Sequence, residues 1–543
     1  MTPRRVTIVG SEVLGLPTAG GPATADSLLA LALARHGHRV EFVLAPGRDM
    51  TRIDPEWASR FGDAGVRLRP LSESTVVQPA FLSPAWHVHE AVRTDPPDVL
   101  IADDWRALSY AALRSRQLGR SCLETAFVLY CHGPARVFAE AARKVPDTLD
   151  RFGEEVAQRA CLALADAVVS PSEWLLGWLR DHDWAVPESA RVIQNLWAST
   201  ALGEKADGAA AAPIIRVAFF GQVRDGKGVR LFIESARGLD PGLQLLFLGH
   251  SRSWTAERLE REIGRPVRFE PNLDRGAALA ELAQPGTLAV MPSLLENSPY
   301  AVAECIERGI PFVATDVGGT PELIASEDHA RVLCEPTSQA LSAALTRALA
   351  APAPARAARP PADSLAAWLG LVEEVRPRRR SPVPAGDDDW VLFGADDPAL
   401  LEALTAAQAA SGADVVTTGL RDGAAVRLFL GDPGPLGIAE NQYGTVGIVR
   451  RSARTAEPAW VLCARQALAG AEIVSVPEAL ATGVPADEDA GARLAVLEVF
   501  EHGNGRALRQ LPQLAATLAA ALARPRPVPA PAGVRDRLRR LLR

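Results

Sequence analysis

Short apolar runs rich in β-branched residues alternate with amphipathic helical segments along most of this chain, and this pattern restricts the possible folds more than any other feature. In the first part, the apolar runs cover residues 6–10, 40–45, 99–103, 126–133 and 166–172. Continuous apolar strands separated by helices are typical of a parallel sheet with helices on both faces. The pattern therefore predicts an α/β protein that begins with a Rossmann-like domain over residues 1–200.

The same alternation starts again after a polar interval rich in alanine and glycine at residues 203–213. An interval of this composition is typical of a linker. The apolar runs that follow cover residues 214–221, 243–249, 267–270, 287–293 and 311–316. A second Rossmann-like domain is expected over residues 213–350.

Proline-rich segments divide the rest of the chain. Residues 351–386 are predicted to be a Pro/Arg-rich linker with one short helix, and residues 387–500 to be a further α/β unit. Residues 501–543 are predicted to be an Arg-rich helical tail that is a short solvated helix, with weak contact to an anionic membrane surface or a partner as the alternative.

Composition excludes several classes of protein. The formal net charge of −7 gives no general attraction to nucleic acid. The six cysteines have no metal-ligand spacing and are expected to be buried thiols in a reducing compartment. No secretion signal is evident, and no apolar stretch approaches the ~18 residues of a membrane span, so a soluble, cytoplasmic protein is expected. Neither a dinucleotide-binding glycine fingerprint nor a P-loop is present.

The turn at residues 221–228, GQVRDGKG, follows an apolar run and precedes a helical segment. Gly221 permits a close approach of the backbone to a ligand, and Lys227 lies near the start of the next helix, where amide groups favour an anion. The chain contains only three lysines, Lys144, Lys205 and Lys227. The turn therefore predicts an anion site, with an ordinary solvated turn as the alternative.

A second motif places two carboxylates seven residues apart. Glu296 is expected in the loop after a strand, and Glu304 two turns into a helix that starts near Ser298. Two such carboxylates can accept hydrogen bonds from hydroxyls of one ligand, while the helix amino terminus faces a phosphate. Gly318 and Gly319 end the next strand and are expected to let the backbone approach the ligand.

With both motifs in order, the segment from Phe219 to Ile324 resembles the nucleotide-sugar-binding domain of retaining GT-B glycosyltransferases of family 4, the E-x7-E type. The amino-terminal half is similar to that family in its glycine loop, its HGP segment at residues 132–134 and its VIQNL segment at residues 192–196. The resemblance implies the GT-B fold, in which two Rossmann-like domains face a cleft. It also implies retaining, metal-independent transfer of a sugar from a nucleoside-diphosphate-sugar, such as a UDP-sugar, to an acceptor hydroxyl. No cofactor is expected beyond this co-substrate.

The resemblance also implies roles for individual residues. Glu304 would bind the ribose hydroxyls, Glu296 the hydroxyls of the donor sugar and Lys227 the diphosphate, while His132 would lie between donor and acceptor. Glu296, Lys227 and His132 are the expected catalytic residues. The remaining expected donor-binding residues are Gly20, Gly21, Gly221, Gln222, Arg224, Asn297, Ser298, Pro299, Tyr300, Ala301 and Gly319.

Some positions depart from the family pattern or allow two readings. Gln222 stands where the family has arginine, and Arg224 is the nearest cation. A buried core histidine is the alternative for His132. Asp103, Asp104 and Trp105 follow a strand and are expected either to contact the acceptor or to cap a helix.

Residues 387–484 resemble the centre of family 2 GT-A glycosyltransferases. The strand that would deliver the metal-binding D-x-D ends instead in Asp396 and Asp397, without the first acid, and Glu457 and Trp460 stand where that family has a Glu-Asp pair before a tryptophan. We interpret this unit as a truncated, noncatalytic remnant kept for packing, acceptor contact or dimerisation. Deletion of residues 381–543 is then expected to leave donor hydrolysis intact.

The expected partners are a nucleotide sugar and an acceptor that is a glycan, a lipid or a small molecule, with no nucleic acid. Homodimerisation stays open. One alternative function is a noncatalytic donor-binding or scaffolding partner of an active glycosyltransferase. Another is a GT-B-fold epimerase or phosphorylase, but a phosphorylase needs a lysine that holds pyridoxal, and Lys227 is the only lysine expected near the cleft.

Overall fold

The computed structural model describes residues 2–17, 19–46, 53–141, 148–203, 212–378, 389–483 and 490–502. The part of the predicted Arg-rich tail that follows His502 lies outside these residues, as do Lys144 and Lys205.

The first domain is built on a seven-stranded parallel sheet in the order β3-β2-β1-β5-β6-β7-β8. Its strands are β1 (Arg5–Gly10), β2 (Arg39–Leu44), β3 (Arg67–Pro70), β5 (Val99–Asp103), β6 (Ala126–Tyr130), β7 (Ala167–Ser170) and β8 (Arg191–Val192). Its helices are α1 (Gly21–Arg35), α2 (Pro55–Asp63), α3 (Ser83–Val92), α4 (Tyr110–Gln117), α5 (Ala135–Ala141), α6 (Leu149–Leu164), α7 (Glu173–Asp181) and α8 (Ala198–Leu202). The strands β1, β5 and β6 are almost fully buried, as their continuous apolar sequences predict.

The second domain contains a six-stranded parallel sheet in the order β11-β10-β9-β12-β13-β14. Its strands are β9 (Arg216–Phe220), β10 (Gln244–Leu248), β11 (Arg268–Glu270), β12 (Thr287–Met291), β13 (Phe312–Thr315) and β14 (Leu333–Cys334). Its helices are α9 (Val229–Ala236), α10 (Ala256–Ile263), α11 (Arg275–Leu282), α12 (Tyr300–Glu307), α13 (His329–Val332) and α14 (Ser338–Ala350). The prediction of an α/β fold with two Rossmann-like domains is confirmed.

The helix predicted within the linker is part of the first domain. This helix, α15 (Pro361–Glu374), returns to the first sheet and buries Trp368 completely. The indole ring packs edge-on against Tyr130 with 4.8 Å between ring centroids, and Arg4 Nη1 donates a hydrogen bond to the carbonyl of Val372 at 2.7 Å. Residues 361–375 are therefore core structure, and the description of residues 351–386 as a linker was too simple.

The described residues from 389 to 502, called here the appended unit, form a mixed sheet in the order β15-β18-β16-β17, with β19 paired to β16. Its elements are β15 (Trp390–Phe393), α16 (Pro398–Ser411), β16 (Val415–Asp422), β17 (Ala425–Arg427), β18 (Gly447–Arg450), α17 (Ala459–Leu468), β19 (Ile473–Thr482) and α18 (Ala490–His502). The sheet continues into the first domain, because β17 pairs in parallel with β4 (Val76–Gln78). The appended unit is thus joined to the first domain through a shared sheet.

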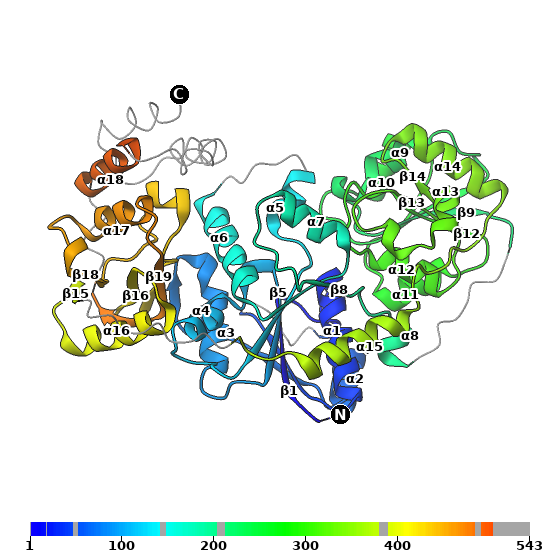
Figure 1. The fold of residues 1–543 in the computed structure, drawn as a ribbon. Helices are drawn as coiled ribbons and strands as arrows, with labels where there is room; N and C mark the ends of the chain where they lie inside the picture. Colours follow the sequence, from blue (N-terminus) through cyan, green and yellow to red (C-terminus); the bar gives the residue numbers. More distant parts are fainter. Residues whose placement is uncertain are drawn as a thin grey trace.

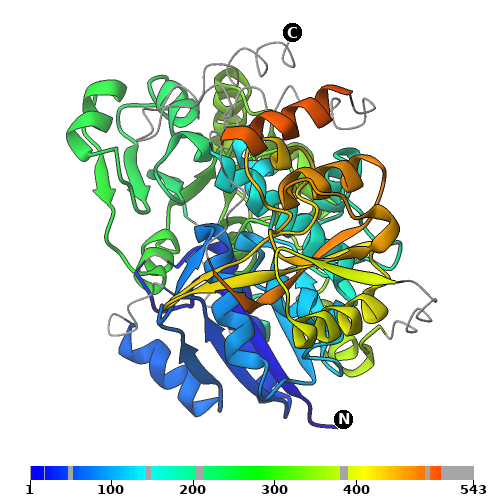
Figure 2. The same ribbon diagram turned by 90° about the vertical axis from the view of Figure 1, so that its left-hand side faces the viewer.

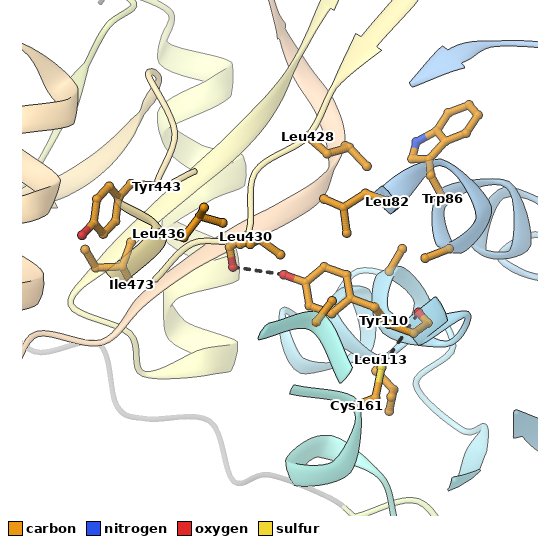
Figure 3. Close-up of a cluster of buried hydrophobic side chains, with 14 of the residues drawn as sticks. Leu82, Trp86, Tyr110, Leu113, Cys161, Leu428, Leu430, Leu436, Tyr443 and Ile473 are labelled. Atoms are coloured by element: carbon orange, nitrogen blue, oxygen red, sulfur yellow. Dashed lines mark hydrogen bonds between the residues drawn. The ribbon is translucent and has the colours of Figure 1, made fainter. Parts of the chain in front are cut away.

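The first domain and the appended unit also share one hydrophobic core. Figure 3 shows Leu82, Trp86 and Tyr110 of the first domain facing Leu428 and Leu430 of the appended unit. The Tyr110 hydroxyl donates a hydrogen bond to the Leu430 carbonyl at 3.0 Å. In Figure 1 the appended unit and the second domain lie on opposite sides of the first domain, and Figure 2 looks onto the appended unit.

Two of the acidic residues that suggested a GT-A remnant, Asp397 and Glu457, have structural partners. The Asp397 carboxylate caps α16 by accepting hydrogen bonds from the amides of Ala399 and Leu400, and Glu457 pairs with Arg465. Trp460 is buried and donates a hydrogen bond to the Gly437 carbonyl at 2.8 Å. The family 2 resemblance stays a prediction.

In the described parts of the chain, no helix combines the length and apolarity needed to cross a membrane.

Candidate active site

The two sequence motifs meet through a direct ion pair. The 3₁₀ turn Asp225–Lys227 follows Gly221 at the end of β9 and leads into α9. Lys227 Nζ lies 2.5 Å from Glu296 Oε1, and Ser293 Oγ donates to the same carboxylate oxygen at 2.6 Å. The Lys227 side chain is 26% exposed and that of Glu296 is 14% exposed. A ligand can therefore reach both side chains and separate the ion pair. An anionic group of the ligand would bind the lysine, and its hydroxyls would donate hydrogen bonds to the carboxylate.

Glu304 lies deeper than Glu296, on α12. This helix begins at Tyr300, after Pro299, so Glu304 is about one turn into it and not two as expected. Burial raises the pKa of the Glu304 carboxyl, and the nearby Arg275 guanidinium, with which it forms an ion pair, partly offsets that effect. In its ionised form, such a carboxylate can accept hydrogen bonds from both hydroxyls of a diol.

The β12–α12 loop contacts the first domain directly. Asn297 Nδ2 donates to the carbonyl of His132 at 3.2 Å, and its carboxamide oxygen accepts a hydrogen bond from Ser172. The Tyr300 hydroxyl donates to the Leu196 carbonyl at 3.2 Å. The loop that carries Glu296 therefore lies at the boundary between the two domains, next to the residues that follow β6.

Gly318 and Gly319 pack against this loop, and the close approach of their backbone to a ligand stays a prediction. A Cβ atom on Gly318 would lie 1.8 Å from the Glu296 carbonyl oxygen, and one on Gly319 would lie 2.0 Å from the Asn297 carbonyl oxygen. The Gly319 amide also donates to the Glu296 carbonyl at 3.0 Å. The glycine pair thus fixes the loop that carries the site.

Replacing Gly319 with alanine is therefore expected to displace this loop. The added methyl group cannot fit beside the Asn297 carbonyl, and overpacking of this kind destabilises a protein by about 1–3 kcal/mol. Thermal unfolding should show a lower Tm, and nucleotide binding should weaken. The matched control is Gly177→Ala in α7, where a Cβ atom meets nothing within 4 Å. An unchanged Tm and unchanged binding in Gly319→Ala would contradict this role.

His132 is buried, and its backbone and side chain both have partners. Its ring Nε2 lies 3.4 Å from Asp26 Oδ1, and its ring centroid lies 4.2 Å from that of Tyr130. Asp26 was not expected in the site, although it is a single acid among apolar residues of α1 and could have been noticed for that reason. Burial raises the pKa of Asp26, and the hydrogen bond with His132 opposes this effect. The histidine thus lies at the domain boundary, paired with a buried carboxyl.

Asp103 and Asp104 are also buried at the end of β5. Asp104 accepts hydrogen bonds from the amides of His132 at 2.8 Å and Gly133 at 3.1 Å, so it holds the HGP segment and does not cap the following 3₁₀ turn. Burial raises the pKa of Asp104 to about 6, while burial and the neighbouring Asp26 raise that of Asp103 well above its ordinary value. Trp105 is partly exposed. Contact of these residues with an acceptor stays a prediction.

Two predicted binding residues lie apart from the ion pair. Arg224 and Gln222 are exposed, and Arg224 Nε donates to Gln222 Oε1 at 3.0 Å. Neither side chain is hydrogen-bonded to Lys227 or Glu296 within the described part of the chain. The replacement of the missing family arginine by Arg224 therefore stays a prediction.

The remaining predicted residues border the two helix starts at the boundary. Gly20 caps α1 and Gly21 is its first residue, where a Cβ atom would meet nothing within 4 Å. Pro299 precedes α12, Ala301 lies in its first turn, and the Ser298 carbonyl accepts a hydrogen bond from Asn195 Nδ2 at 3.4 Å.

Glu322, which was not expected in the site, joins the two domains. The Glu322 carboxylate, on the second domain, accepts hydrogen bonds from the amides of Glu173 and Trp174 at the start of α7, each at 2.8 Å. Carboxylates are favourable at helix amino termini because they satisfy free amides and face the positive end of the helix dipole. This contact fastens the second domain to the first beside the Asn297–Ser172 hydrogen bond.

Comparisons with known proteins agree with this architecture. Residues 19–196 match the family described as glycosyltransferase family 4, and residues 215–351 match the family described as glycosyl transferases group 1. No protein of curated function gives a significant match.

Several solved structures are similar to this chain. Sucrose-phosphate synthase from Thermosynechococcus elongatus is 20% identical, with 68% of this chain and 96% of that chain covered and a TM-score of 0.49. HepE from Anabaena, in complex with UDP and glucose, is 16% identical, with 68% and 98% covered and a TM-score of 0.46. The catalytic domain of starch synthase IV from Arabidopsis thaliana, bound to ADP and acarbose, is 16% identical, with 64% and 92% covered and a TM-score of 0.43.

The two family matches cover the two parallel-sheet domains whose motifs meet at the boundary. The chain is therefore a glycosyltransferase with the GT-B fold.

Proposed function

We propose that this protein moves a sugar from a nucleoside-diphosphate-sugar to an acceptor hydroxyl, with retention of the anomeric configuration and without a metal ion. The observation that carries the proposal is the Lys227–Glu296 ion pair, which unites the two motifs at the domain boundary. Glu304, about one turn into α12, supplies the second carboxylate.

Each charged group has a part in donor binding. The Glu304 carboxylate accepts hydrogen bonds from the two ribose hydroxyls, and the Glu296 carboxylate accepts them from the donor sugar. Lys227 leaves Glu296 and binds the diphosphate, assisted by the amides at the start of α12, near Ser298 and Ala301. The ligand thereby replaces one ion pair with two charge-assisted interactions.

The same groups favour the reaction. The bond between the sugar C1 and the diphosphate oxygen breaks, and the acceptor oxygen forms a bond to C1 on the same face. The proton of the acceptor hydroxyl passes to the departing phosphate oxygen. A fixed cation stabilises the negative charge that develops on the diphosphate more strongly in the transition state than in the bound donor.

The appended unit is proposed to be noncatalytic. Asp397 is used as a helix cap, and Glu457 is paired with Arg465. The unit lies on the opposite side of the first domain from the second domain, which contains the Lys227–Glu296 ion pair (Figure 1). Its contribution is packing against the first domain. A cytoplasmic location and an acceptor that is a glycan, a lipid or a small molecule are further parts of the proposal.

A panel of UDP-, ADP- and GDP-sugars tests the proposal. Release of nucleoside diphosphate should occur with at least one donor and should increase with a suitable acceptor, and NMR of the product should show the donor's anomeric configuration. Inversion would contradict the retaining mechanism. Gln222 favours a second candidate, a noncatalytic donor-binding partner. Binding of a donor without release of nucleotide, whatever the acceptor, would support that candidate.

A further inference from the structure

Arg275 connects three elements at the domain boundary. It is the first residue of α11, in the second domain, and its guanidinium forms an ion pair with Glu304 on α12. The guanidinium carbon lies 5.1 Å from the centre of the Tyr300 ring, and Nη1 donates to Thr24 Oγ1 at 2.8 Å. Thr24 belongs to α1 of the first domain, so one side chain links the ribose-binding carboxylate to the opposite domain.

Thr24 lies in the first turn of α1, beside the glycine loop. Its hydroxyl donates a hydrogen bond to the Gly20 carbonyl at 3.1 Å, which leaves its oxygen to accept from Arg275. The Arg275 guanidinium therefore donates to the Thr24 hydroxyl, and this hydroxyl donates in turn to the carbonyl of Gly20 in the glycine loop. A guanidinium suits such a position because its planar set of donors can serve a carboxylate and a hydroxyl together while it lies over an aromatic ring.

We propose that Arg275 is a positioning residue for the donor, which orients the Glu304 carboxylate toward the ribose hydroxyls and ties it to α1 when the two domains are together. The assignment of the ribose to Glu304 rests on the proposed function. Arg275 acts through Glu304 and does not itself take part in the chemistry.

The charge of Glu304 makes this role of Arg275 measurable through the pH dependence of nucleotide binding. Burial and the nearby Glu307 raise the pKa of Glu304, whereas Arg275 and Arg308 lower it, and Tyr300 also faces this group. Loss of the Arg275 charge therefore raises the Glu304 pKa further. A protonated carboxyl has lost the negative charge of the carboxylate and therefore accepts hydrogen bonds from the ribose hydroxyls more weakly. When the pH is lowered, a variant without the Arg275 charge should therefore lose nucleotide binding at a higher pH than the unaltered protein does.

The test measures nucleoside diphosphate binding by calorimetry from pH 5 to pH 8, with whichever of UDP, ADP and GDP the full chain binds most tightly. Arg275→Gln should weaken binding by about tenfold or more, which is about 1.4 kcal/mol, and should shift the acid midpoint of binding upward. Arg275→Lys should keep the midpoint near its original value because it keeps the charge. Thr24→Val should weaken binding less and leave the midpoint unchanged.

Arg258→Gln is the matched control. Arg258 also pairs with a glutamate, Glu262, and lies over an aromatic ring, that of Trp254, but on α10. The Arg258→Gln variant should bind nucleotide with the affinity and the acid midpoint of the unaltered protein. In a Glu304→Gln background, Arg275→Gln should produce no further shift of the midpoint. If the unaltered protein binds nucleotide and Arg275→Gln matches it in affinity and midpoint, the inference is wrong. If the unaltered protein binds none of the three nucleotides, the proposed function itself is wrong.

Discussion

Replacing Lys227 with alanine is expected to lower kcat/KM for the sugar nucleotide by about 10²- to 10³-fold, the loss typical when one preorganised charge-stabilising group is removed. Lys227 is the cation that pairs with Glu296 and borders the start of α9. Without it, the diphosphate loses its direct counter-charge both when the donor binds and when the bond to C1 breaks. Initial rates of nucleotide release over a range of donor concentrations measure the effect.

Two further variants distinguish the loss of the Lys227 charge from a disturbance of the surrounding structure. Arg230→Ala removes a cation from the same region, because Arg230 lies in α9 and pairs with Asp225 on the surface. It should keep near-normal kinetics. Lys227→Arg keeps the charge with a different shape and should fall between the alanine variant and the unaltered protein. Normal turnover by Lys227→Ala would remove this lysine from the site.

A chain that ends at Arg378 is expected to unfold or aggregate, which is the largest stability effect that the structure suggests. Its first domain would expose side chains now covered by the appended unit, among them Leu82, Trp86, Tyr110 and Leu113 (Figure 3). Exposing four large apolar side chains to water costs about 10 kcal/mol. This cost is comparable to the free energy of unfolding of a whole domain. Thermal unfolding and size-exclusion chromatography of the shortened chain measure this effect.

Point variants test the same interface at full length. Leu430→Ala should lower the free energy of unfolding by about 2–5 kcal/mol. Arg421→Ala, on the exposed end of β16, should change it by less than about 0.5 kcal/mol. A shortened chain that stays monomeric and melts cooperatively at the original Tm would show that the appended unit is dispensable for folding. The expectation from sequence that deletion of residues 381–543 leaves donor hydrolysis intact treated this unit as separate, whereas the structure shows a shared core.

The sheets of both GT-B domains could be predicted from sequence because their strands are buried on both faces and read as continuous apolar runs. The core motifs could also be predicted, since Lys227 and Glu296 lie in loops at the carboxyl ends of neighbouring strands, β9 and β12, where ligands bind in such folds. Their direct pairing follows from that shared edge.

Other features could not be predicted because they depend on contacts between segments far apart in sequence. Nothing in the local pattern around Trp368 shows that α15 packs on the first sheet, and β4 is a three-residue strand whose partner β17 lies near residue 426. Arg275 is one of many arginines, and only the fold brings it to both Glu304 and Thr24. The glycine pair is visible in the sequence, but its packing against the Asn297 carbonyl depends on the fold.

A structure determined with a bound sugar nucleotide, or with its unreactive analogue, tests the central claim most directly. We expect Lys227 Nζ to leave Glu296 and lie within hydrogen-bonding distance of the diphosphate, with the ribose hydroxyls on the Glu304 carboxylate. A nucleotide bound elsewhere, with the Lys227–Glu296 ion pair intact, would contradict the assignment of this boundary as the active site.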